Sequence, residues 1–213
     1  MHSGRPYAVV ATALLAGGLA AGADVTLELA ESGLIQAVRV GGQPAAGSVD
    51  LLVPKPGWKG NHGSLREGRA LQRTGDPAAA GGSIRGAIPA AGEAVLTYTC
   101  TVQRQAEGLR LDYEDTPARD LEVAAVVAQV ARDMDTLKGQ EWTLLDGAAS
   151  RTGTFPAELP DPYTFVSESG FEALAWPVGG GTLLTLKPDW GTVGRVSLQD
   201  DRRFGMARYE LQV

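Results

Sequence analysis

Trp58 and His62 are the two side chains whose type and setting best suit contact with a ligand. Both lie in the segment Trp58-Lys59-Gly60-Asn61-His62-Gly63, inside a stretch rich in Gly, Pro and polar residues over positions 54–83. We expect a long surface loop there, and loops often carry binding residues. An exposed indole offers a flat face for stacking on a sugar ring, and His62 offers an acid/base or hydrogen-bonding group. The alternatives are packing of Trp58 beneath the loop and an ordinary exposed histidine.

The sequence argues against the common catalytic and metal-binding constellations. It contains two histidines, and His2 falls in the leader described below, so His62 stands alone. Zinc sites built from several histidines, and mechanisms that need two, are therefore excluded. Asp112 and Glu114 could form a glycosidase-like carboxylate pair, but we interpret them as ordinary cross-strand pairs on an exposed strand face. We find no nucleophile elbow, phosphate loop or calcium loop, and we expect no catalytic residue, metal or cofactor.

Apolar and polar residues alternate from Ala94 to Glu114 and predict a long antiparallel hairpin with a Glu107-Gly108 turn. Successive strand side chains point to opposite faces, so one parity should be buried. That parity carries Ala94, Leu96, Tyr98, Cys100, Val102, Leu109, Leu111 and Tyr113. Cys100 is the only cysteine, so no intramolecular disulfide can form, and we expect a buried, unreactive thiol.

The N-terminus has the layout of a secretory signal peptide. Arg5 precedes a run of apolar and small residues from Tyr7 to Ala20, and Ala21-Gly22-Ala23 forms a cleavage site. We predict that residues 1–23 are a signal peptide and that the product is secreted or periplasmic. The alternative, an uncleaved membrane anchor, conflicts with two glycines in the run and with its length, because a spanning helix needs about 20 apolar residues.

Residues 24–213 are expected to form a single domain, since their number suits one sandwich better than two. The formal charge is −6, and Lys and Arg are spread along the chain rather than clustered. This distribution argues against nucleic acid and anionic membrane surfaces as partners.

Short strands with Gly and Pro turns between them predict an all-β fold, an antiparallel β-sandwich. Trp142 and Trp176 lie in apolar strand patterns and are expected in the core, whereas Trp190, like Trp58, lies in a turn. The expected strands outside the hairpin are 25–30, 34–40, 48–53, 142–145, 171–176, 182–186, 193–198 and 208–213.

Two further segments do not follow the simple strand pattern. The region Thr116 to Gly139 has helix caps and an Ala-rich body, so a short helix is an alternative there, but we favour a strand over Leu121–Val130 because its flanks are β. Asp200-Asp201-Arg202-Arg203 is interpreted as a charged turn whose geometry an Asp-Arg pair fixes.

The C-terminal half resembles the β-supersandwich domains of the galactose-mutarotase-like superfamily, found in bacterial carbohydrate-active enzymes. The resemblance rests on the hairpin Val95–Tyr113, on the stretch from Gly139 to Pro156 and on the ending from Ser197 to Leu211. It implies a supersandwich-like domain that accompanies a glycosidase or lyase and is not itself catalytic. Mutarotases of this family use two histidines with a carboxylate, a set that this chain does not supply.

Three functional hypotheses follow. The first is an exported, non-catalytic β-sandwich that binds or accompanies carbohydrate, with a polysaccharide or oligosaccharide contacting Trp58 and His62. The second is a structural exported domain that binds a protein partner. The third is a carbohydrate-active enzyme of lyase or epimerase type that uses His62 or a carboxylate. The fold alone does not decide among them.

Overall fold

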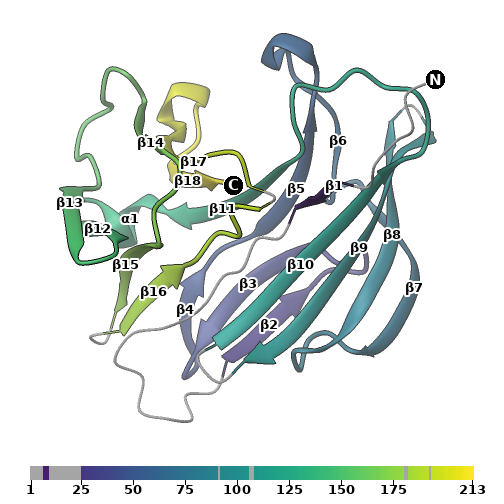
Figure 1. Cartoon of the computed structure of the whole chain (residues 1–213), viewed down its shortest axis with the longest axis horizontal. Helices are drawn as coiled ribbons and strands as arrows, with labels where there is room; N and C mark the ends of the chain where they lie inside the picture. The colour runs from purple at the N-terminus through teal and green to yellow at the C-terminus, as the bar shows by residue number, and fades with distance from the viewer. Residues whose placement is uncertain (1–6, 10–24, 91, 106–107, 180–181, 192) are drawn as a thin grey trace.

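The predicted hairpin forms the centre of an antiparallel five-stranded sheet in the computed structural model (Figure 1). The structure describes residues 7–9, 25–90, 92–105, 108–179, 182–191 and 193–213. The strands follow the order β1 (Tyr7–Val9), β10 (Gly108–Pro117), β9 (Glu93–Gln105), β8 (Gly81–Ala90) and β7 (Arg69–Asp76).

The alternation along the hairpin sets its register and its buried face. Cys100 pairs with Tyr113, and Val102 pairs with Leu111. All members of the apolar parity are buried except Ala94, which is exposed near the start of β9. Glu107, predicted in the turn, lies outside the described residues. The hairpin prediction is confirmed for the paired strands.

A nine-stranded sheet carries the elements that later form the candidate site. Its main path runs through β14 (Thr164–Glu168), β17 (Val196–Asp200), β18 (Arg208–Gln212), β11 (Val127–Asp133), β5 (Val49–Pro54), β3 (Ile35–Val40) and β2 (Val25–Leu29). Two further strands extend it, β4 (Gln43–Ala46) on β3 and β6 (Asn61–Ser64) on β5. The 3₁₀ turn η1 (Pro56–Trp58) joins β5 to β6, and η2 (Asp201–Phe204) joins β17 to β18. Both turns lie at the upper end of the view in Figure 1.

A four-stranded sheet completes the fold, at the left of Figure 1. Its order is β13 (Ala149–Thr154), β12 (Glu141–Asp146), β15 (Ala173–Gly179) and β16 (Thr182–Leu186). The short helix α1 (Met134–Leu137) begins directly after β11, where the Asp133 side chain accepts the Asp135 N–H at 2.9 Å as an N-cap. Buried residues of all three sheets belong to one apolar core. Over the described residues, the fold is all-β and antiparallel with one short α-helix, as predicted.

Two sequence predictions need correction. The favoured strand over Leu121–Val130 begins only at Val127, where pairing with β5 starts, and continues to Asp133, where pairing with β18 ends. Residues 121–126 have no regular structure. Residues 54–83 are not one long loop, since they contain η1, β6, β7 and the start of β8. Strand β7 escaped detection because, as an edge strand, it exposes nearly all its side chains and therefore shows no apolar alternation.

The N-terminal prediction falls mostly outside the described residues. Of residues 1–23, only Tyr7–Val9 are described, and they pair with β10 as β1. Signal cleavage and the single-domain bounds 24–213 therefore stay predictions. Among the described residues, no helix combines the length and apolar character that a membrane crossing requires.

Candidate functional site

A cleft of about 640 Å³ is lined by residues of η1 and η2 and of the strands near them. Both turns lie in the upper part of Figure 1. Strands β14, β17, β18 and β11, which are neighbours in the nine-stranded sheet, contribute residues to the floor of the cleft. Trp58 of η1 and Phe204 of η2 belong to its rim. Concave sites with a few placed polar groups are the usual form of small-ligand sites, so this cleft is the candidate functional site.

Polar residues at alternate positions of β17 and β18 form the floor. Ser197, Gln199 and Gln212 line the cleft, and Ser197 is the register partner of Gln212. The residues between them, including Leu198 and Leu211, are buried in the core. Because strand side chains alternate between faces, this sheet covers the core with one face and presents amide and hydroxyl groups to the cleft with the other.

Trp58 stands at the rim with 59% of its surface exposed. Its φ of 58° lies in the left-handed region, which a bulky residue rarely adopts. The turn is closed by two hydrogen bonds: the Trp58 N–H donates to the Lys55 carbonyl at 2.9 Å, and the Lys55 N–H donates to the Gly60 carbonyl at 2.8 Å. The loop thus holds a large apolar ring in water at a backbone conformation that costs about 1 kcal/mol or more.

A second aromatic group lies on the η2 side of the cleft. Phe204 is 55% exposed, and its ring packs edge-to-face on Tyr163 with centroids 5.5 Å apart and an interplanar angle of 82°. The Tyr163 carbonyl accepts the Asp200 N–H at 2.9 Å, which ties this ring to the end of β17. The cleft therefore has aromatic rings from two different parts of the chain.

Beside the floor amides, on the same face of the sheet, lies a buried charged network that fixes them. Arg208 bridges two carboxylates, Asp201 and Glu210, at 2.6 Å each. The Gln199 Nε2 donates to the same two carboxylates at 3.0 Å, and the Gln212 Nε2 donates to Glu210 at 2.8 Å. Since both carboxylates are almost fully buried, these bonds hold the Gln199 and Gln212 side chains in fixed orientations.

Burial dominates the electrostatics of this network. Desolvation, followed by the negative charge of nearby Asp201, raises the pKa of Glu210 to about 7. Next to it, Arg202 pairs with buried Asp200 at 2.6 Å and also donates to the Pro156 and Ala157 carbonyls. The charged turn predicted at 200–203 exists, and its Asp-Arg pair forms between Asp200 and Arg202. Both aspartates are nevertheless buried, because Arg202 pairs with Asp200 and Arg208 of β18 pairs with Asp201.

The structure separates the two residues that the sequence analysis placed together. Trp58 lines the cleft, whereas His62 lies outside the lining. The His62 Nε2 lies 3.0 Å from the Glu122 carbonyl, in the irregular segment that leads to Ala125 and Val126 of the cleft wall. His62 thus contacts the segment that leads to the wall and does not itself line this cleft, and a ligand contact by His62 stays a prediction.

The other candidate groups lie away from the cleft. Cys100 is fully buried, and burial raises the pKa of its thiol to about 12, as expected for an unreactive cysteine. Asp112 pairs with Arg110 of its own strand at 2.8 Å rather than across strands, and Glu114 is exposed. Trp142 and Trp176 are buried in the core as predicted. Within the described ranges, no three His, Cys, Asp or Glu side chains could jointly hold a metal ion.

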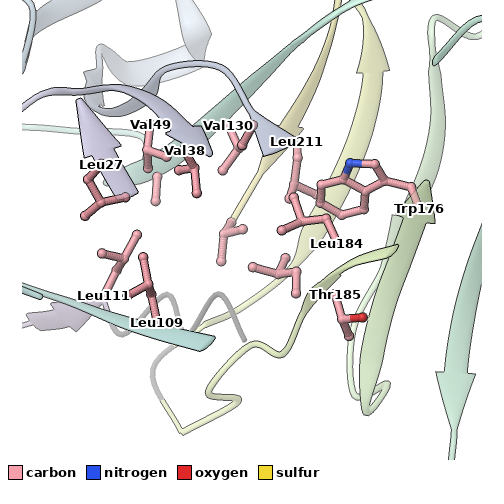
Figure 2. A pocket seen from close by; sticks show the side chains of 14 residues that line it. Leu27, Val38, Val49, Leu109, Leu111, Val130, Trp176, Leu184, Thr185 and Leu211 are labelled. Carbon is pink, nitrogen blue, oxygen red and sulfur yellow. The ribbon is translucent and has the colours of Figure 1, made fainter. Parts of the chain in front are cut away.

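Figure 2 shows a separate cavity in the apolar interior, where all three sheets meet. Leu27, Leu109 and Leu184 come from different sheets and converge there, beside Trp176. Its volume is about 40 Å³ and its walls are almost entirely aliphatic. A space of this size holds about one water, which would lack polar partners. We interpret it as a packing defect of the core rather than a ligand site.

Most residues of the cleft were not predicted from the sequence. Their signal was the polar alternation Ser197-x-Gln199 and Glu210-x-Gln212 in the two last strands, which marks one non-core face. Phe204 and Tyr163 carry no comparable signal, because only the tertiary fold brings them to the same cleft.

We compared the chain with protein-family models, with curated proteins and with solved structures, and none of them matches it. The resemblance to galactose-mutarotase-like domains therefore remains a prediction.

Proposed function

We propose that this protein is an exported, non-catalytic β-sandwich that binds carbohydrate in the cleft between η1 and η2. The proposal rests on the position of Trp58. This residue lines the cleft, its side chain is exposed to water, and its backbone has a disfavoured conformation. Strained conformations that persist in a fold tend to mark functional positions. A ring that only stabilised the protein would be expected to lie buried.

The chemistry of the cleft matches the two kinds of surface on a sugar. A pyranose has flat C–H faces, which pack on aromatic rings, and hydroxyl edges, which form hydrogen bonds. Trp58 and Phe204 supply the rings. Both Gln199 N–H donors are engaged by Asp201 and Glu210, so this residue offers its Oε1 as an acceptor for a hydroxyl.

The two alternative hypotheses are less well supported by the cleft. An enzyme of lyase or epimerase type needs an acid/base group at the substrate, but the lining contains neither a carboxylate nor His62. Exposed Trp58 and Phe204 are also compatible with a protein partner. The concave shape and the polar floor between them favour a small, hydroxyl-rich ligand instead.

Glycan-array screening followed by isothermal titration tests the proposal. The Trp58→Ala variant is expected to weaken saccharide binding about tenfold or more, because it removes the main apolar contact. Leu71→Ala is the matched control, since Leu71 is 60% exposed on β7, outside the cleft lining. Equal weakening by both variants, or an array with no bound saccharide, would refute the proposal; a stable protein complex that W58A disrupts would replace it with the partner hypothesis.

A further inference from the structure

The charged side chains that line the cleft are of one sign. Among the fourteen residues that line the cleft there is one arginine, Arg195, and no Asp, Glu, Lys or His. The chain as a whole is acidic, with 25 Asp and Glu against 19 Lys and Arg. A cleft without acidic side chains in an acidic protein suits an anionic group better than a cationic one.

Arg195 is placed to meet a ligand rather than to stabilise the fold. It follows Gly194 at the approach to β17, and both residues are exposed. Its only hydrogen bond among the described residues is a long one, from Nη1 to the Ser167 Oγ at 3.4 Å, and it forms no ion pair with any residue that the structure describes. The guanidinium therefore keeps most of its donors for a ligand.

Unlike Arg195, the nearby Arg202 and Arg208 have their guanidinium groups engaged by carboxylates of the protein. Arg202 is bound to buried Asp200 at 2.6 Å, and Arg208 is bound to buried Asp201 and Glu210 at 2.6 Å each, so both guanidinium groups are engaged within the fold. Arg208 and the floor amides engage the oxygens of Asp201 and Glu210, and neither carboxylate lines the cleft. Among the lining side chains, the charge that can meet a ligand is therefore the positive charge of Arg195.

The other polar groups of the cleft indicate where an anionic group of the ligand can lie. Gln199 presents an acceptor, which pairs with hydroxyl donors and repels a carboxylate. An anionic group on the ligand must therefore lie toward Arg195, whose planar fork matches the two oxygens of a carboxylate. Trp58 and Phe204 require that the same ligand also have a ring face.

We propose that the cleft binds a hexuronate residue of an acidic saccharide, with the sugar carboxylate on Arg195, the hydroxyl groups on the floor and the ring against Trp58. The inference rests on the carbohydrate-binding function proposed above and adds the ligand class and the residue that selects it.

The test is isothermal titration of the full chain with uronate oligomers, namely galacturonate, glucuronate and mannuronate. Each is paired with its neutral methyl ester, and a sulfated oligosaccharide of similar length is included. At least one acid oligomer is expected to bind about tenfold tighter than its ester, the range of a charge-assisted hydrogen bond. Arg195→Gln should remove this preference with little effect on ester binding, and Arg195→Lys should restore part of it.

Arg85→Gln is the matched control, because Arg85 is exposed on β8 of the five-stranded sheet, outside the cleft lining. Equal binding of acid and ester, an unchanged preference in R195Q, or binding of the sulfated oligosaccharide alone would overturn the uronate inference. If neutral saccharides still bind in a Trp58-dependent manner, the carbohydrate proposal survives that outcome. If no saccharide binds at all, both proposals fail.

Discussion

At the scale of single residues, Trp58 combines local strain with exposure. Its neighbour Gly57 also has a positive φ, of 67°, so the turn demands two consecutive left-handed residues. Glycine satisfies this demand without cost, whereas an indole-bearing residue does not. Trp at the second of these positions therefore lowers the stability of the folded state, and a contact with a ligand would explain why it is there.

Replacing Trp58 with Gly and with Ala separates these two effects. Both variants are expected to lose saccharide binding, since neither has a ring. Glycine accepts the left-handed backbone at this position and alanine does not, so Trp58→Gly should be more stable than Trp58→Ala by about 1 kcal/mol. Urea unfolding measures the difference. A glycine variant less stable than the alanine variant would show that the backbone is not strained there.

Asp115 is a buried carboxylate that forms no ion pair with any described residue. It is 2% exposed on β10, its Oδ1 has no hydrogen-bond partner, and burial raises its pKa to about 6 from 3.8. The folded state therefore binds this proton more tightly than the unfolded state. The stability that depends on the protonated form is full below pH 3.8 and is lost as the pH rises through 6.

The variant Asp115→Asn should flatten that dependence. Between about pH 4 and pH 7, the wild type is expected to lose on the order of 2 to 3 kcal/mol more stability than Asp115→Asn. Glu210 has the same direction of shift, but it is present in both proteins, so the difference between their urea unfolding curves isolates Asp115. Parallel curves across this range would contradict the assignment.

At the scale of elements, the buried network joins η2 to β18. Asp201 belongs to η2, whereas Arg208 and Glu210 belong to β18, and the guanidinium bridges them. The same carboxylates hold Gln199 of β17. The network therefore fixes the positions of the cleft-floor side chains. A substitution that breaks it should lower both the stability of the fold and the affinity for a ligand.

Arg208→Met tests the coupling. It leaves two buried carboxylates without their cation, and we expect a loss of about 3 to 5 kcal/mol in the free energy of unfolding. The control is Arg203→Met in η2, whose side chain is exposed and which should change stability by less than about 0.5 kcal/mol. Chemical denaturation of the three proteins checks both values. A loss for Arg208→Met no larger than that of the control would show that the network does not stabilise this end of the sheet.

Sequence patterns predicted the elements that have one apolar face and failed for those that do not. The alternation around Cys100 predicted β9 and β10, because burial of one face is visible as period two. Strand β7 was missed because nearly all its residues are exposed and it therefore shows no apolar alternation. Of the residues that line the cleft, the sequence singled out Trp58 alone. Arg195 and Phe204 gain their meaning from neighbours that are distant in the sequence, and the contact of His62 with Glu122 is likewise a tertiary one that no local pattern shows.

At the scale of the whole molecule, the three sheets share one core. Leu27, Leu109 and Leu184 line the same interior cavity although they belong to different sheets (Figure 2). Separation of any one sheet would expose apolar surface on the others. The sheets should therefore unfold together rather than one after another.

This predicts a single cooperative unfolding transition for the protein. Tryptophan fluorescence, which reports on Trp142 and Trp176 in the core, and far-UV circular dichroism, which reports on all strands, should give coincident urea curves. Two resolved transitions, or curves that do not coincide, would contradict a shared core and favour independent units.

The most direct test of the carbohydrate proposal is NMR observation of the indole N–H groups of the four tryptophans during titration with the oligosaccharide that binds best. The account predicts that the Trp58 resonance, assigned from its loss in Trp58→Phe, shifts and saturates with the ligand, while Trp142, Trp176 and Trp190 remain in place. A Trp58 resonance that stays unmoved under saturating ligand, or shifts confined to the other three, would contradict it.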